Sequence, residues 1–266
     1  INVSGNAILI YGFHCGTEGV AIPTLVSRFV AAFIIIKLLL KDKWTLHLKR
    51  TFRFNPDWSM IRKILSVGIP NGLENSMFQL GKVLVLSLVS TFGTYAIAAN
   101  AVSNVITLFS ILPGQAICLA VTTVIARCVG AGDYEQAKYY NKKLILLTHI
   151  GMTITIFIVF ITLPFILKVY NLSEAASEAT RHIIWFHGCC AILIWAESFT
   201  LPATFRACGD AKACMIISTV SMWIFRVGAS YILGKNLGLG VFGVWVAMII
   251  DWAFRCLLYT SDAADD

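Results

Sequence analysis

The stretch Gly68–Phe92, GIPNGLENSMFQLGKVLVLSLVSTF, decides the fold because it is apolar enough to lie in a bilayer and yet carries polar side chains at that depth. At helical spacing these side chains fall on one side, and such a stripe indicates a helix that lines a wet cavity. Two alternatives stay open: the lysine pairs with a carboxylate inside a bundle, or the asparagines hydrogen-bond to neighbouring helices. The polar residues are Asn71, Glu74, Asn75, Gln79 and Lys82.

The whole chain has the composition of an integral membrane protein. Of its 266 residues, 58% are hydrophobic and 13% are charged, and the mean hydropathy is +0.78, which excludes a soluble globular domain. The formal net charge of +7 does not indicate a nucleic-acid partner, because the basic residues cluster in short segments between apolar runs. The eight cysteines contain no CxxC pair, so neither a disulfide framework nor a zinc site is expected.

Apolar runs long enough to span a bilayer, which takes about 20 residues, recur along the chain. Residues 1–13 read as the second half of one helix, ending at Gly12, and another helix starts near Glu18 and runs to Leu40. The only long polar segment follows at 41–63 and holds seven Lys or Arg against two Asp. It is the predicted boundary between two helix bundles. Further spans are expected at about 61–91, 95–127, 140–168, 178–205, 213–234 and from 240 to 255 onward.

The loops between these spans alternate between net basic and neutral. This alternation supports the number of spans independently of hydropathy, and it places the basic linker in the cytoplasm.

A second helix carries a similar polar face, and a third carries a carboxylate. Asn100, Asn104 and Gln115 recur at helical spacing and are expected either to line the same cavity or to bond to neighbouring helices. Glu197 lies in an apolar helix, where a buried carboxyl group takes up a proton or, with other oxygens, holds a cation. Glu74 and Glu197 are therefore the candidate coupling sites, including for Na⁺.

The remaining ionisable residues indicate no catalytic site. Asp251 and Arg255 are spaced for a local ion pair, and Arg226 needs a partner that the sequence does not identify. His149, His182 and His187 are isolated in sequence. Enzyme, phosphate, zinc and cofactor motifs are absent, so the sequence predicts no enzyme and no ATP site. Uphill transport by this chain would have to draw on an ion gradient.

Several segments, taken together and in order, resemble the multidrug and toxic compound extrusion (MATE) family of secondary antiporters. Each segment alone is a weak signal, but the set covers nearly all of residues 1–255. The segments are GVAIPTLVSR at 19–28, GIPNGLENSMFQLGKVLV at 68–85, YAIAANAVSNV at 95–105, ARCVGAGDYEQAK at 126–138, FRACGDAK at 205–212 and GVFGVWVAMIIDWAFR at 240–255.

The resemblance implies an all-α polytopic membrane bundle with twelve helices in two lobes. On that map residues 1–40 are the end of the N-terminal lobe, with part of helix five and helix six. Residues 41–63 are the cytoplasmic interlobe linker, and 64–255 are helices seven to twelve of the C-terminal lobe, the last one truncated. Residues 256–266, CLLYTSDAADD, resemble the translation of a sequencing-library adapter and are expected to be a non-native tail; a genuine acidic tail is the alternative.

The resemblance also implies a function. We expect a multi-pass protein of the bacterial inner (plasma) membrane that exports organic compounds, cationic and amphipathic, in exchange for Na⁺ or H⁺. Its partners are the lipid bilayer, a small organic substrate and the N-terminal lobe of the same protein, with no cofactor beyond the coupling ion. A flippase of the same superfamily for a lipid-linked or polyanionic substrate is one alternative, and a non-transporting membrane scaffold is another.

Overall fold

The structure is a computed structural model that describes residues 2–40 and 56–265, with only the backbone for residues 261–265. It divides into two compact units, residues 1–57 and 58–266. In the first, α1 (Asn2–Ala7) continues into the π-helical turn η1 (Ile8–Gly12) and packs against α2 (Glu18–Leu39). Both predicted helix limits, Gly12 and Glu18, are confirmed. The basic segment 41–55 lies outside the described residues.

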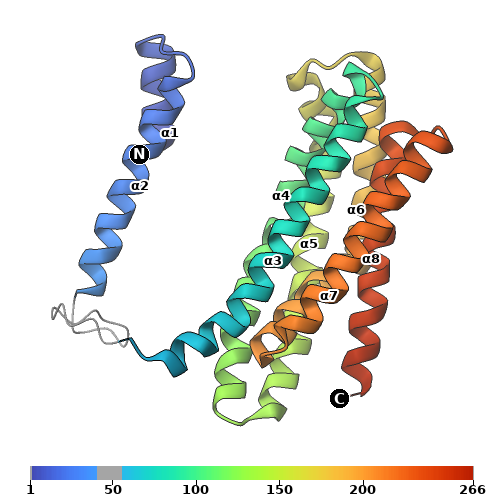
Figure 1. The fold of residues 1–266 in the computed structure, drawn as a ribbon. Coiled ribbons are helices and arrows are strands. Elements are labelled where there is room, and N and C mark those ends of the chain that lie inside the picture. The colour runs from blue at the N-terminus through green and yellow to red at the C-terminus, as the bar shows by residue number, and fades with distance from the viewer. Residues whose placement is uncertain (1, 41–55, 266) are drawn as a thin grey trace. The chain divides into compact units, whose positions relative to one another are not determined.

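The second unit is a bundle of long antiparallel helices (Figure 1). Its first helix begins at Trp58, before the expected start at about residue 61. The last residues of the predicted linker, from Trp58 to Lys63, are therefore helical. Of the other helices, α5 begins six residues before its predicted start, and the remaining limits lie within four residues of the predicted ones, with α8 running on past residue 255. The helices of this unit are α3 (Trp58–Ser90), α4 (Thr94–Gly130), α5 (Tyr134–Tyr170), α6 (Glu174–Cys208), α7 (Ala211–Ser221) with the π-helical segments η2 (Met222–Gly228) and η3 (Tyr231–Asn236), and α8 (Gly240–Asp265).

Short capped turns make consecutive helices antiparallel neighbours. Asp133 and Asp210 begin α5 and α7, each accepting a hydrogen bond from a backbone N–H in the first turn, at 3.0 and 3.1 Å. Ser173 does the same for α6. Asn171 and Gly209, with φ of 47° and 100°, end α5 and α6 in the left-handed region that such caps require.

Six helices of the described ranges are long and apolar enough to cross a membrane: α2, α4, α5, α6, the segment Ala211–Asn236, and Gly240–Thr260 of α8. The helix α3 is also long, with 33 residues, but it does not reach the same apolar composition. Its polar residues are the ones that the sequence singles out. The protein is thus an all-α, multi-pass membrane protein, as expected.

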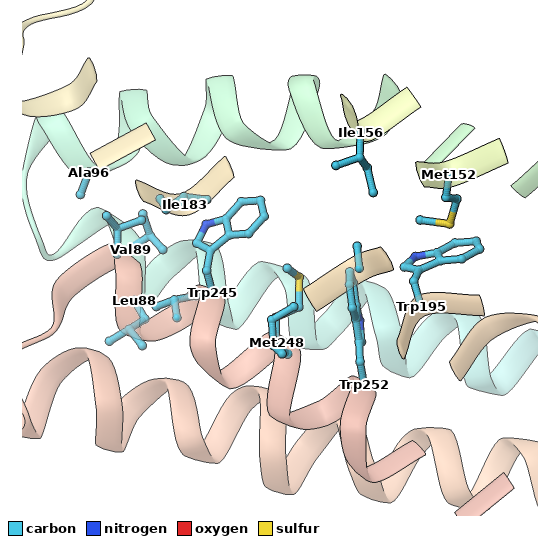
Figure 2. Close-up of a cluster of buried hydrophobic side chains, with 14 residues drawn as sticks. Leu88, Val89, Ala96, Met152, Ile156, Ile183, Trp195, Trp245, Met248 and Trp252 are labelled. Atoms are coloured by element: carbon cyan, nitrogen blue, oxygen red, sulfur yellow. The ribbon is translucent and has the colours of Figure 1, made fainter. Parts of the chain in front are cut away.

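The core of the second unit lies where α4, α5, α6 and α8 meet. Trp195, Trp245 and Trp252 fill it together with Met152 and Ile156 (Figure 2). Glycines let the backbones approach: a Cβ built on Gly114 of α4 would lie 2.3 Å from the Trp195 ring. The outward side of α5 instead carries exposed apolar side chains such as Ile161 and Phe165, as expected of a surface that faces lipid.

The helix α8 continues without a break through residues 256–265. A helical conformation does not distinguish native from non-native residues, so the expected non-native origin of this tail stays a prediction.

Replacing Gly243 of α8 by Ala should destabilise the bundle. The added Cβ would lie 2.8 Å from the carbonyl carbon of Leu233 in η3, and backbone cannot rotate away as a side chain can. We expect the free energy of unfolding to fall by about 1–3 kcal/mol, measured by denaturation of the purified protein in detergent. The matched control is Gly72→Ala, where no heavy atom lies within 4 Å of the new Cβ. Equal losses in both variants would contradict this explanation.

Candidate functional site

The polar residues of α3 separate into two faces. Glu74 is buried and lies on the same face of α3 as Pro70 and Gly81, which are buried in the bundle. Asn75, Gln79 and Lys82 are exposed in the described structure, and Asn71 is half-buried next to them. The predicted single stripe is therefore two adjoining faces, an inward one that carries the carboxylate and an outward one that carries amides and the lysine.

Glu74 is paired with Arg206 of α6. The Arg206 Nη2 donates to Glu74 Oε1 at 2.8 Å and so joins α3 to α6 through two residues that are 132 apart in sequence. Glu74 Oε2 and Arg206 Nε are buried and have no hydrogen-bond partner among the described residues. The guanidinium group is permanently charged. Glu74 thus lies beside a fixed positive charge that the sequence did not connect with it.

Glu197 of α6 is paired with His149 of α5. The His149 Nε2 lies 2.8 Å from Glu197 Oε1, and the other ring nitrogen, Nδ1, lies 2.9 Å from the carbonyl oxygen of Ile192. The two side chains keep 28% and 24% of their surface exposed, so the described residues enclose the pair only in part. Glu197 Oε2 is nevertheless buried and has no hydrogen-bond partner within the described part of the chain. His149 appears isolated in the sequence, and the structure shows that it is not.

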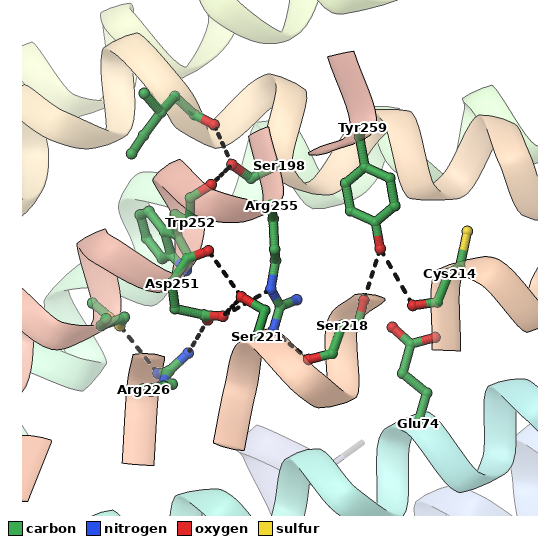
Figure 3. Close-up of polar contacts among 12 residues, drawn as sticks. Glu74, Ser198, Cys214, Ser218, Ser221, Arg226, Asp251, Trp252, Arg255 and Tyr259 are labelled. Atoms are coloured by element: carbon green, nitrogen blue, oxygen red, sulfur yellow. Dashed lines mark hydrogen bonds and ion pairs between the residues drawn. The ribbon is translucent and has the colours of Figure 1, made fainter. Parts of the chain in front are cut away.

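A third cluster joins α7, η2 and α8 (Figure 3). Asp251 is fully buried and accepts from Arg255 Nε at 3.0 Å and from the Ser221 hydroxyl at 2.5 Å. The local Asp251–Arg255 pair is thus confirmed. The missing partner of Arg226 is the same carboxylate, with Nη1 at 4.0 Å from Asp251 Oδ2. The Arg255 guanidinium also lies over the ring of Phe78, 4.6 Å from its centroid, which ties α3 to the cluster.

The polar face of α4 is divided in the same way as that of α3. Asn100 Oδ1 accepts from the indole Nε1 of Trp245 on α8 at 3.1 Å, so this residue connects helices. Asn104 is exposed and donates to the backbone carbonyl of Asn100, and Gln115 is exposed further along. The candidate residues therefore do not form one cluster. Among the described residues, the pairs of Glu74 with Arg206 and of Asp251 with Arg226 and Arg255 lie inside the unit. The His149–Glu197 pair is partly exposed, and amides with one lysine lie on the surface.

The family is decided by comparison with known proteins. The MatE family model matches residues 70–232, which is more than half of the chain and includes both candidate carboxylates. The chain belongs to the MatE family. Members of this family are transporters and not enzymes, as the sequence predicted.

Relatives by sequence agree with the family. The probable multidrug resistance protein NorM of Thermotoga maritima is 26% identical over 93% of this chain and 53% of its own length. The uncharacterized transporter YisQ of Bacillus subtilis is 26% identical over 97% of this chain and 58% of its own length. The chain thus spans about half the length of the curated relatives that it matches.

Solved structures agree on the MatE fold. An outward-facing multidrug resistance MATE family transporter of the MOP superfamily superposes with a TM-score of 0.86 at 20% identity, covering 97% of this chain and 57% of that one. A MOP superfamily transporter from Pyrococcus furiosus, described as having a binding pocket of reverse polarity, has the same score and identity over 97% and 58%.

Replacing Asp251 by Asn should destabilise the second unit strongly, because it leaves Arg226 and Arg255 buried without a counter-charge. Losing one partner of a buried ion pair removes about 3–5 kcal/mol of unfolding free energy. Denaturation in detergent measures it. The exposed carboxylate Glu178 of α6 gives the matched control Glu178→Gln, which should leave stability unchanged. An Asp251→Asn variant as stable as the wild type would refute the assigned role of this cluster.

Proposed function

We propose that the complete protein is a secondary active antiporter that exports organic, cationic and amphipathic compounds in exchange for inward Na⁺ or H⁺. The observation that carries the proposal is Glu197, a carboxylate within a membrane helix that is partly exposed and keeps one oxygen without a hydrogen-bond partner among the described residues. Glu74 is the second coupling candidate. The family relationship supports export, since the NorM relative is a probable multidrug resistance protein.

The proposed mechanism is competition for negative charge. A proton or sodium ion that binds the carboxylate in the outward-facing state lowers the affinity for a cationic substrate and favours its release. In the inward-facing state, loss of the ion restores the charge and the substrate binds. The exposed amides of Asn71, Asn75, Gln79, Asn104 and Gln115 then line the substrate path and bond to polar groups of the substrate.

We further propose that the substrate path lies between this unit and an N-terminal lobe of the same protein. Alternating access requires two lobes that move against each other around a site between them. The basic linker 41–63 then lies in the cytoplasm, and the protein lies in the plasma membrane of a bacterium. The bacterial sources of the sequence relatives support this location.

A second candidate is a transporter of the same superfamily for an anionic or lipid-linked substrate. One observation favours it: the carboxylates Glu74 and Asp251 are each paired with arginine, whereas Lys82 on the outward face of α3 is exposed, and no ion pair involves it among the described residues. The outward face of α3 then offers positive charge to the substrate, and Lys82 would bind an anionic group.

Replacing Glu197 by Gln should reduce ion-driven export by at least about tenfold, which corresponds to about 1.4 kcal/mol of coupling. Glu74→Gln should also reduce it. Export of a fluorescent organic cation from proteoliposomes is the measurement, with protein expressed from the complete reading frame. The control is Glu178→Gln, an exposed carboxylate in the same helix as Glu197. If both candidate variants exported like the wild type, the coupling sites would lie elsewhere.

Replacing Lys82 by Gln separates the two candidate functions. If the substrate is a cation, removal of this positive charge should preserve or increase binding, because a like charge disappears from the path. If the substrate is an anion, binding should weaken by at least about tenfold. Binding of cationic and anionic fluorescent dyes to the same purified variants gives the answer. Lys138→Gln, at an exposed position in the first turns of α5, is the matched control.

A further inference from the structure

The pair formed by His149 and Glu197 differs from the other ion pairs of the described residues because both of its members can change protonation. Glu74 and Asp251 lie beside arginines, which do not release a proton in proteins. An imidazole and a carboxyl group, by contrast, can each bind or release a proton. Among the described ion pairs, it is therefore the one whose net charge can change when a proton is gained or lost.

The hydrogen bonds of the imidazole fix where its protons are. The carbonyl oxygen of Ile192 can only accept, so His149 Nδ1, at 2.9 Å from it, carries a hydrogen and donates. The 2.8 Å contact between Nε2 and Glu197 Oε1 then requires one more proton between these two atoms, on either side. Without that proton, a nitrogen lone pair would face a carboxylate oxygen at hydrogen-bond distance. The pair as observed thus holds one exchangeable proton and is neutral overall.

Few charged groups surround the His149–Glu197 pair, so its charge is set mainly by its own two side chains. On the α4 side, the sequence has no charged residue between Thr94 and Ala126. On the α8 side, the Cys256 thiol interacts electrostatically with Glu197, and Asp251 and Arg255 of the same helix are paired with each other. Lysines of α5 and Arg206 of α6 lie turns away along those helices, and Arg206 is already bound to Glu74. The charge of the pair therefore depends chiefly on its own proton.

The same surroundings offer little to a sodium ion. A hard cation needs several oxygen ligands. Next to Glu197, the hydroxyl of Ser198 lies 2.7 Å from the carbonyl oxygens of both Ile194 and Trp252 and donates its hydrogen to one of them. The Thr200 hydroxyl contacts the Cys118 thiol at 3.7 Å. Nitrogen occupies one side of the carboxylate, and the neighbouring oxygens are engaged.

We propose that His149 and Glu197 together form a one-proton site, and that this proton, rather than Na⁺, is what an organic cation displaces from the lobe. Release of the proton to water leaves the pair with one negative charge, and one positive charge of the substrate replaces it, so the exchange is neutral. His149 is then a binding residue in its own right. The link to transport rests on the proposed antiport, whereas the proton site does not.

Packing explains why the pair stays in place while its proton changes. Met152 and Trp195, which flank His149 and Glu197 on their helices, pack against Gly114 of α4; a Cβ there would lie 2.9 Å from the Met152 sulfur. The two backbones are therefore held by close contact and not by the ion pair. A site of this kind can lose its proton without separating α5 from α6.

The direct test counts protons. Protein expressed from the complete reading frame is purified in detergent with little buffer, and tetraphenylphosphonium is added while a pH indicator reports release, between about pH 5 and 8. We expect about one proton for each cation bound, and none on addition of NaCl at the same ionic strength. Glu197→Gln and His149→Gln should each abolish the release. Glu178→Gln and His182→Gln, exposed positions of α6, should keep it.

A second measurement tests the proton site without an organic cation, so it does not depend on substrate binding. The infrared carboxyl signal that disappears in Glu197→Gln is followed against pH in sodium and in choline chloride. We expect the same titration in both salts and a changed one in His149→Gln; size-exclusion profiles establish that the variants are folded. A titration that shifts with sodium, or proton release that survives in Glu197→Gln, would overturn the proposal.

Transport assays separate this inference from the proposed function. If a sodium gradient alone drives export and no proton is released, the antiport stands and the proton site is wrong. If one proton is released per cation but no gradient drives export, the proton site stands and the antiport is wrong.

Discussion

The arrangement of the second unit depends on the fact that a bilayer offers no counter-charge, so every ionised side chain at that depth has to find a partner in the protein. The described structure meets this requirement for its buried carboxylates with pairs that cross between helices. Glu74 pairs with Arg206 between α3 and α6, and Asp251 pairs with Arg226 between α8 and η2. The same contacts that satisfy the charges therefore also fix which helices are neighbours.

Close packing acts together with these pairs. Lipid is as apolar as leucine, so burial of apolar side chains does not by itself bring membrane helices together. The bundle instead brings backbones close at small residues: Gly81 of α3 packs against Met222, and Gly188 of α6 packs against Phe160. The tryptophans then fill the spaces between helices, and Trp245 satisfies its N–H with Asn100. Polar and apolar contacts thus alternate along the same interfaces.

The sequence predicted the helices well because length, hydropathy and capping residues are local properties. It predicted the Asp251–Arg255 pair for the same reason, since both lie on one helix. It did not predict that Glu74 turns away from Asn75 and Lys82, because spacings of three and four cover a wide arc of a helix. Glu74 lies on the inward face because it pairs with Arg206, which is 132 residues away and which no local pattern identifies.

The partnership of His149 with Glu197 stands between these cases. The residues are 48 apart, but they lie at nearly equal distances from the turn between α5 and α6, on adjacent antiparallel helices. Asn141 and Thr204, further from the same turn, are matched in the same way and are joined by a 2.8 Å hydrogen bond. A capped short turn therefore fixes the register of the whole hairpin. An apparently isolated histidine in such a hairpin should be compared with the residue opposite it before it is dismissed.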